Sequence, residues 1–420
     1  MDRILAIPIE LRAGGSFVLG ALVGSLVNLW VYQLAWEPRA TSHWSRTDAS
    51  WTQRIPIVGW LAAGRQGSDI PGSGAWLRPM LVELLTGAIF AGLYFWEVQW
   101  LGLMPAARLA PAAAWYAHAA VLSHWVLISL MLAASLIDID ERIIPDSITV
   151  PGTLAGLFLA ALVPWSLLPA ALVPVAADPP TIEVLKLTTP NPWPERLAGF
   201  PHIGSLVLGL GCFGLWCVAL LPRRWHSRRG WRTAVVLLVA RMTRDRWSPL
   251  VMTMGVAGSV AIFLVWCVGG ADHWAALLSA LVGLAGGAGL VWSVRVIGTS
   301  VLGREAMGFG DVTLMGMIGA FLGWQSTLII FFLSPFCALA IAVIQWLRHR
   351  ETEIYYGPFL CLAAGVLIIR WESIWNWARP IFALAWLVPI VMIVCLTLLA
   401  GLLYVWRVLA LWFGEQPDGP

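Results

Sequence analysis

The sequence predicts an all-α membrane protein, a polytopic bundle of about eleven transmembrane helices with its N-terminus outside the cytoplasm. Three observations support this fold class. Of the 420 residues, 59% are hydrophobic and only 12% are charged, about half the charged share of a soluble domain. Uncharged stretches of roughly 20 residues or more, the length that crosses a bilayer, recur along the chain. The 27 tryptophans suit the two membrane–water interfaces.

The positions of the charged residues delimit the spans. The first uncharged run is taken as an uncleaved anchor, because it exceeds the apolar core of a typical signal peptide. The run 312–347 is long enough for two helices, with a break expected at Gly323 and the polar residues after it. The predicted spans lie within 13–36, 80–102, 109–137, 147–177, 197–222, 247–271, 273–294, 312–347, 354–371 and 380–406.

The arginines predict the orientation, because positively charged short loops stay in the cytoplasm. Two arginines precede the first span, whereas the loop 37–79 carries five and the segment 222–248 carries eight. Alternation of the spans then leaves the acidic, proline-rich loop 178–200 outside. The arginines of 222–248 either only satisfy this rule, or lie on anionic lipid, or contact assembly partners.

The chain divides by role into five segments without a separate soluble domain. The net charge of +3 indicates no general basic surface, so the expected surroundings are the lipid bilayer and not nucleic acid. The segments are the N-terminal anchor 1–36, the cysteine-free cytosolic loop 37–79, the membrane region 80–199, the additional spans with the arginine-rich loop 200–272, and the membrane region 273–420.

Two acidic residues lie where charge is costly, at the ends of apolar runs. Asp138 ends the run 109–137, and Asp311 begins the run from 312, so both are expected at the cytosolic membrane boundary. Two carboxyls brought close share a proton, so one can activate a water while the other protonates a peptide carbonyl. That is aspartic-protease chemistry. Gly308 and Gly310 would let an extended substrate strand approach the backbone closely.

Each aspartate also has a structural interpretation. Asp311 fits a helix N-cap after Gly310, and Asp138 fits a polar loop leaving the bilayer. Asp146, after Pro145, is interpreted as a helix cap. A different class of function, an ion- or proton-coupled transporter with paired aspartates, is disfavoured because transport sites lie near the bilayer midplane.

Two stretches, in matching order, resemble the active-site motifs of the type IV prepilin peptidase family of membrane aspartic proteases. They are SLIDIDERIIPDSITVP at 135–151 and EAMGFGDVTLMGMIGAFLGW at 305–324. The resemblance implies that Asp138 and Asp311 are catalytic and that Gly308 and Gly310 are the glycines of the GxGD motif. Shorter matches are GALVGSLVNLWVYQL from Gly20, RIPIVGWL from Arg54, LVELLTG from Leu81 and YGPFL from Tyr356.

The resemblance implies an endopeptidase that cuts the leader from type IV prepilin or type II secretion pseudopilin precursors, in which a short basic leader is followed by an apolar helix. The expected place is the bacterial inner (plasma) membrane, with the active site facing the cytosol. An inactive assembly protein of the same fold is disfavoured, because neither aspartate is replaced. Ile137 before Asp138 favours the prepilin side over presenilin-like GxGD enzymes, which usually have tyrosine there.

The first cytosolic loop departs from the family pattern. Many members carry two CxxC pairs there, a spacing that would bind zinc, whereas 37–79 has no cysteine. His43, Asp48 and Asp69 are too few and too oxygen-rich for a closed structural site, so no metal is expected. Without zinc the loop must be held by apolar contacts, for which it offers Trp44, Trp51, Trp60 and Trp76.

The resemblance leaves a second activity open. Bifunctional members methylate the new N-terminus with S-adenosylmethionine, an activity associated with the first-loop region. Glu83 matches a family position and marks the candidate methyl-transfer region. After Pro79 it also fits the first turn of a helix, where the positive dipole end favours a carboxylate.

Overall fold

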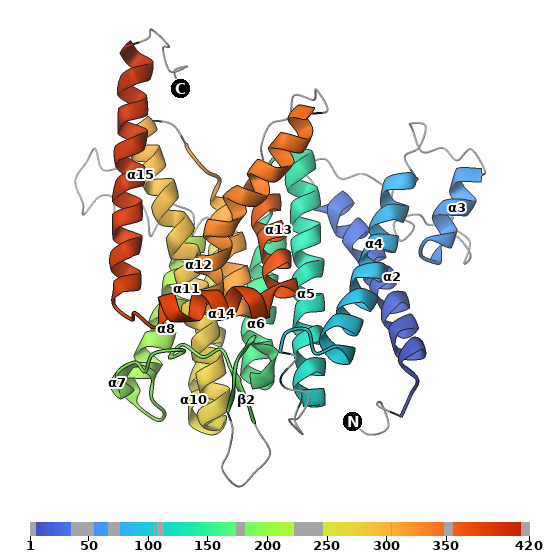
Figure 1. Ribbon diagram of the computed structural model, residues 1–420, viewed down its shortest axis with the longest axis horizontal. Coiled ribbons are helices and arrows are strands. Elements are labelled where there is room, and N and C mark those ends of the chain that lie inside the picture. The colour runs from blue at the N-terminus through green and yellow to red at the C-terminus, as the bar shows by residue number, and fades with distance from the viewer. Residues whose placement is uncertain are drawn as a thin grey trace.

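The computed structural model describes residues 6–34, 54–65, 76–104, 106, 113–173, 181–221, 247–303, 305–347 and 356–412. These residues form a helical bundle with a small two-stranded hairpin at one end (Figure 1). In this part of the chain, eight helices are long and apolar enough to cross a membrane, and one bent pair would make nine. The all-α membrane fold is thus confirmed, whereas the count of eleven and the outside N-terminus stay predictions.

The first half contains α2 (Ile9–Gln33), α3 (Val58–Arg65), α4 (Leu77–Leu93), the π-helix η2 (Tyr94–Gln99), α5 (Ala113–Glu141) and α6 (Asp146–Leu162). Polar contacts fasten neighbouring helices here. Asn28 of α2 donates from Nδ2 to the carbonyl oxygen of Pro79 in α4, at 2.9 Å. A polar group without a partner is costly away from water, so such contacts fix which helices are neighbours.

α6 ends earlier than the uncharged run 147–177 predicts. The 3₁₀ turn η4 (Pro164–Ser166) follows it, and the chain continues into β1 (Pro169–Val173), which pairs antiparallel with β2 (Thr181–Val184). Proline lacks the N–H that a helix needs and restricts the residue before it, so the helix cannot continue through Pro164. Residues 164–173 therefore correct the prediction: they form a turn and the first strand of the hairpin, and not the end of a span.

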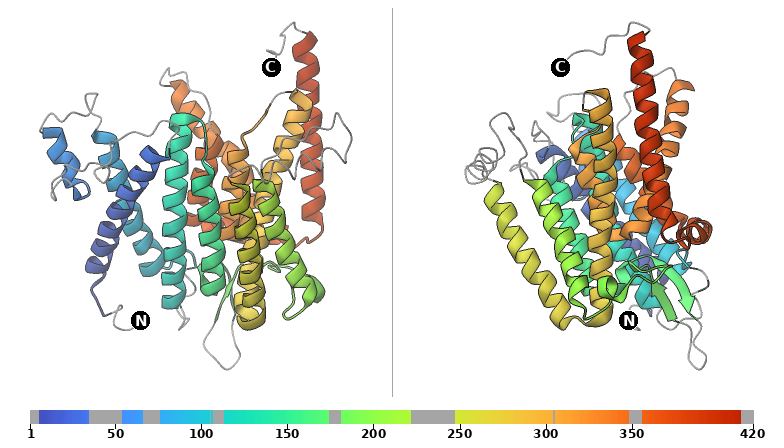
Figure 2. Two further views of the ribbon diagram at one scale, coloured as in Figure 1. Left: turned by 180° about the vertical axis from the view of Figure 1, so that it is seen from behind. Right: turned by 90° about the vertical axis from the view of Figure 1, so that its left-hand side faces the viewer.

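The second half contains α7 (Glu195–Ala198), α8 (Ile203–Leu220), α10 (Ser248–Val268), α11 (Gly270–Leu302), α12 (Phe309–Leu347), α13 (Tyr356–Ile369), α14 (Trp371–Phe382) and α15 (Leu387–Trp412). α14 is bent by 95° from α13 and lies across the bundle, where Figure 2 shows it end-on. The hairpin anchors it, because Trp371 and Trp375 donate their indole N–H groups to the carbonyls of Pro169 (2.7 Å) and Ala170 (2.9 Å).

α12 consists of two helical segments joined at Gly323, as the sequence predicts. Gly323 has φ 82° and ψ 169°, a backbone conformation that residues other than glycine rarely adopt. A Cβ placed on Gly319 would lie 3.0 Å from Cγ2 of Thr327. A continuous helix would separate these residues by about 12 Å, so the chain folds back on itself.

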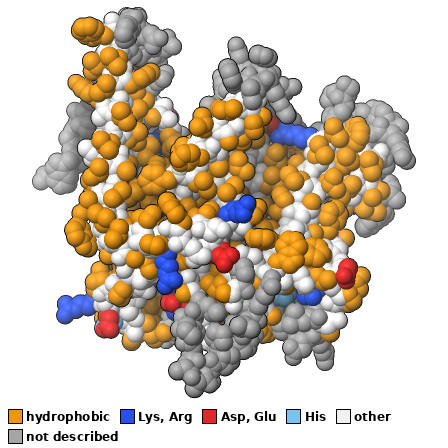
Figure 3. All heavy atoms as spheres, in the orientation of Figure 1, with side chains coloured by type: hydrophobic (Ala, Val, Ile, Leu, Met, Phe, Trp, Pro, Cys, Tyr) orange, Lys and Arg blue, Asp and Glu red, His pale blue; other side chains and the backbone are white. Residues whose placement is uncertain are grey.

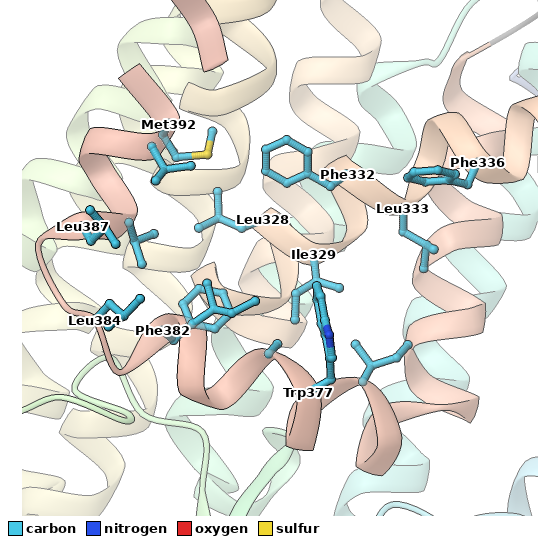
Figure 4. Close-up of a pocket in the computed structure, with 15 residues that line it drawn as sticks. Leu328, Ile329, Phe332, Leu333, Phe336, Trp377, Phe382, Leu384, Leu387 and Met392 are labelled. Carbon is cyan, nitrogen blue, oxygen red and sulfur yellow. The ribbon is translucent and has the colours of Figure 1, made fainter. Parts of the chain in front are cut away.

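Hydrophobic side chains cover most of the face seen in Figure 3, as expected for a surface in lipid. Between α12, α14 and α15 they line an apolar groove of about 410 Å³, drawn in Figure 4. Phe332, Trp377 and Met392 belong to this lining, and none of the lining residues is titratable. The groove therefore offers no catalytic chemistry.

Candidate active site

Asp138 and Asp311 line the same cavity, which has a volume of about 710 Å³. It lies where α5 ends and where α6, α12 and α13 begin. The two carboxyls are close enough to interact electrostatically. The structure thus brings together the two residues that the sequence singles out from separate parts of the chain.

Asp138 lies in the last turn of α5 and is only 7% exposed. Its carboxylate accepts the backbone N–H of Gly357 in the first turn of α13. A Cβ on Gly357 would lie 2.6 Å from Oδ2 of Asp138, so a residue with a side chain would push the two apart. Arg142 ends the helix in the left-handed conformation, with φ 62°, and turns the chain toward α6.

Asp311 is the third residue of α12, so its interpretation as the N-cap is wrong. Its carboxylate reaches back and accepts the N–H of Gly308, the residue before the helix. A Cβ on Gly310 would lie 2.8 Å from Cβ of Ile144, which makes a larger residue difficult there. A Cβ on Gly308 would meet its nearest atom, Oδ2 of Asp311, at an ordinary 3.7 Å.

Asp146 is a third acid in the cavity, and its role differs from the expected cap. It is the first residue of α6, whose start has no side-chain cap hydrogen bond. Its carboxylate bonds instead to Thr313 of α12, and Thr149 of α6 donates to Oγ1 of Thr313 at 3.1 Å. These contacts join α6 to the helix that carries Asp311. The only indication of this role in the sequence is that Asp146 lies within the stretch 135–151, which resembles an active-site motif.

Tyr356 also lines the cavity and was given no role from the sequence, although YGPFL was noted for its resemblance. Its hydroxyl lies 2.7 Å from Oγ of Ser334 in the second segment of α12. This contact holds the start of α13, including Gly357, against α12. Tyr356 and Gly357 could not be assigned from one sequence, because their partners lie far away in the chain.

Comparisons with known proteins find relatives for the segments that carry the two aspartates. The model of the type IV leader peptidase family matches residues 125–177 and 233–343, which contain Asp138 and Asp311 respectively. A prepilin leader peptidase/N-methyltransferase of Pseudomonas aeruginosa is 31% identical over 212 residues, which cover 44% of this chain and 69% of that protein. The chain belongs to the type IV leader peptidase family. The predicted family and enzyme class are thereby confirmed, and the transporter alternative receives no support.

Two further relatives bear the same name. The Myxococcus xanthus protein is 34% identical over 154 residues, covering 34% of this chain and 39% of that protein. The Stutzerimonas stutzeri protein is 29% identical over 163 residues, covering 36% of this chain and 54% of that protein. No solved structure matches the chain. The chain thus spans from about two fifths to about two thirds of these relatives' lengths.

Glu83 lies apart from this cavity. α4 begins at Leu77 with no acidic residue in its first turn, so the interpretation of Glu83 as a first-turn residue is wrong. The side chain is fully buried. It accepts the N–H of Ile57 at 2.6 Å on Oε2 and the indole N–H of Trp60 at 3.0 Å on Oε1. Glu83 therefore fastens the segment before and within α3 to α4.

These contacts give Glu83 a structural role. Both carboxylate oxygens accept hydrogen bonds from the chain itself, and none of the contacts described for Glu83 identifies a binding site for S-adenosylmethionine. Trp60, one of the expected loop anchors, is 1% exposed. Across the residues that the structure describes, no three His, Cys, Asp or Glu side chains could hold a metal ion. The other loop residues considered, His43, Trp44, Asp48, Trp51 and Asp69, lie outside the described part.

Proposed function

We propose that the protein is a membrane aspartic endopeptidase that removes the leader from type IV prepilin or pseudopilin precursors. Asp138 and Asp311 are the catalytic pair. The observation that carries the proposal is that these two carboxyls, from separate family-matched segments, line one cavity. A hydrolytic site needs two such groups side by side, one as base and one as acid.

The chemistry follows from the pair sharing one proton. The ionised carboxyl removes a proton from a water, which attacks the peptide carbonyl, while the protonated carboxyl gives its proton to the carbonyl oxygen. The tetrahedral diol then collapses: the C–N bond breaks, the carboxyl that took the water's proton gives it to the leaving amine, and the other carboxyl takes back the hydroxyl proton. The N–H groups of Gly357 and Gly308 each hold one carboxylate in place. Carboxyls that are already held in place lose little conformational entropy in the transition state, so their positioning raises the rate. The reaction needs no covalent intermediate and no metal.

We place this site at the cytosolic face of the bacterial inner membrane. The support is the distribution of arginine, with eight in 222–248 and five in 37–79. In a background without the six native cysteines, a single cysteine at Ser227 should resist impermeant thiol reagents in intact cells. One at Thr188 should react with them. Reaction at Ser227 from outside would invert this orientation.

The decisive test is cleavage by the purified, full-length protein of pilin-like precursors from the same organism. The product's N-terminus is sequenced, and we expect one cut at the junction between the basic leader and the apolar segment. Cleavage should survive EDTA. No cleavage of any precursor by the folded protein, or loss of cleavage on chelation, would overturn the proposal. In a separate reaction with added S-adenosylmethionine, mass spectrometry of the cleaved product measures whether its new N-terminus is methylated.

A further inference from the structure

A second cavity lies beside the catalytic cavity and shares Phe309 with it. It has a volume of about 270 Å³ and lies between α8, α11 and the start of α12. Val312 and Thr313, which follow Asp311, belong to its wall. We call it the α8 groove. A chain held at Asp311 can therefore continue into this groove without leaving the protein surface.

The wall that α8 contributes is apolar with a single unpaired donor. It runs from Cys212 to Leu220, about 12 Å along the helix, or two helical turns. Trp216 lies in this wall and is only 5% exposed. Its indole N–H is buried and has no acceptor among the described residues. The groove thus fits the apolar side chains of a short segment.

The α8 groove is open toward the lipid. Leu215 on α8 is 64% exposed and Trp292 on α11 is 43% exposed, and both belong to its lining. A segment already in the bilayer can therefore enter sideways, without passing through water. That route requires an occupant as apolar as its surroundings.

The junction between the two cavities is held firmly by α11. Nε of Arg295 donates to the carbonyl oxygen of Met307 at 2.9 Å, and its guanidinium lies 5.7 Å from the ring centre of Phe309. Arg295 also pairs with Glu305. These contacts hold in place the segment at which the α8 groove and the catalytic cavity meet.

We propose that the α8 groove binds the apolar segment that follows the scissile bond of the precursor and that α8 selects which precursors fit. This inference rests on the proposed function. Its support is continuity, since Phe309 lines both cavities and Val312 and Thr313 lie next to Asp311. α8 lies in 178–232, which the family model does not match, so this wall can differ from that of other members.

The larger groove of Figure 4 is the natural comparison. It is also apolar, but it shares no lining residue with the catalytic cavity. The described lining of that groove therefore gives a bound segment no direct continuation to Asp311. A probe at Phe336 in that groove therefore serves as a control for a probe in the α8 groove.

Gly289 offers a way to fill the α8 groove without disturbing its walls. It lines the groove, and a Cβ added there would meet no atom within 4 Å. Gly289→Leu should raise KM for a full-length precursor by about tenfold or more, because added side-chain volume competes with the occupant. Gly214→Leu is the matched control: this α8 glycine also has open space and does not line the groove, so KM should stay unchanged.

A modified substrate distinguishes a filled groove from general damage to the enzyme. A precursor whose first apolar residues are replaced by alanine should be cleaved by Gly289→Leu about as well as by the wild type. Equal KM for both enzymes on the original precursor would overturn the groove assignment and leave the proposed function intact. No cleavage by the wild type would instead remove the proposed function, so the two failures are distinguishable.

Crosslinking tests the occupant directly. In the inactive Asp311→Asn background, a photoreactive amino acid at Leu215 should crosslink to the apolar segment just after the cleavage site. The same probe at Phe336 should not. Crosslinks from Leu215 to lipid alone, with added precursor in excess, would show that the α8 groove holds acyl chains and would overturn the proposal.

Discussion

In the part of the chain that the structure describes, two pairs of titratable side chains are built in opposite ways. Asp138 and Asp311 carry like charge and face an open cavity of about 710 Å³. Glu97 and His124 are groups of opposite charge type, joined at 2.7 Å between Oε1 and Nδ1, and both side chains are fully enclosed. The first pair is costly to hold and available for chemistry. The second pair makes one hydrogen bond, while Oε2 of Glu97 and Nε2 of His124 are buried without a partner among the described residues.

The difference shows how to distinguish catalytic from structural acids in a membrane protein. A buried carboxylate is usually hydrogen-bonded to a close partner, as Glu97 is to His124, and this pair is enclosed away from any substrate. Two carboxyls in one cavity cannot both ionise, so a proton stays available. Glu97 lies in η2, where the wider π-helical turn changes the direction of its side chains toward α5.

The largest expected effect is on the catalytic pair. Asp138→Asn and Asp311→Asn should each lower the cleavage rate at least about ten-thousandfold, because an amide can neither accept nor relay the shared proton. Both proteins should remain folded and inserted, which size-exclusion chromatography in detergent checks. Near-normal cleavage by either variant would remove that residue from the mechanism.

Two other aspartates serve as graded controls for that experiment. Asp140 is paired with Arg78 at 2.9 Å at the edge of the bundle, so Asp140→Asn should keep most activity. Asp146→Asn is expected to lose roughly tenfold, because its bond to Thr313 helps to place the helix that carries Asp311. Full activity of Asp146→Asn would contradict this expectation and would mean that the bond to Thr313 does not affect catalysis.

The enclosed pair should affect stability and not chemistry. Glu97→Ala or His124→Ala should lower the free energy of unfolding by about 3–5 kcal/mol, because each leaves the other polar group buried and unpaired. Replacing both residues by leucine should restore most of that loss. Thermal unfolding in detergent measures it, with Asp272→Asn as control, since the exposed Lys186–Asp272 pair should contribute about 0–1 kcal/mol.

The glycines of the site provide a smaller, geometric test. Gly357→Ala and Gly310→Ala should each lower kcat by roughly ten- to a hundredfold, because the new methyl group would displace Asp138 or Ile144. Gly308→Ala should lose less, since its Cβ would lie 3.7 Å from the nearest atom. Equal losses at Gly308 and Gly310 would show that backbone freedom, and not close packing, is what the site requires.

The smallest effect concerns pH. The cleavage rate of the wild type should fall on both sides of an optimum, because at low pH no ionised carboxyl remains to act as base and at high pH no protonated one remains to act as acid. The Glu97→Ala variant, assayed where it is folded, should keep the same profile. A shifted profile there would mean that the two pairs are coupled.

The sequence by itself determined the fold class and most helix positions, because the cost of placing charge in lipid acts on each segment separately. It also determined the break at Gly323, where only glycine adopts the backbone conformation easily. Pro164 marks the end of α6 in the sequence, but the uncharged run continues past it, so charge alone does not reveal this end. Asp138 and Asp311 stood out because each interrupts an apolar run.

Only the tertiary structure decided which residues meet. The approach of Gly357 to Asp138, the contact of Asp146 with Thr313, and the burial of Glu83 against Trp60 each join segments far apart in the chain. Hydropathy cannot predict such contacts, because in lipid every apolar helix face is equally satisfied by acyl chains. Neighbours are then selected by close packing and interhelical hydrogen bonds, which depend on the folded arrangement.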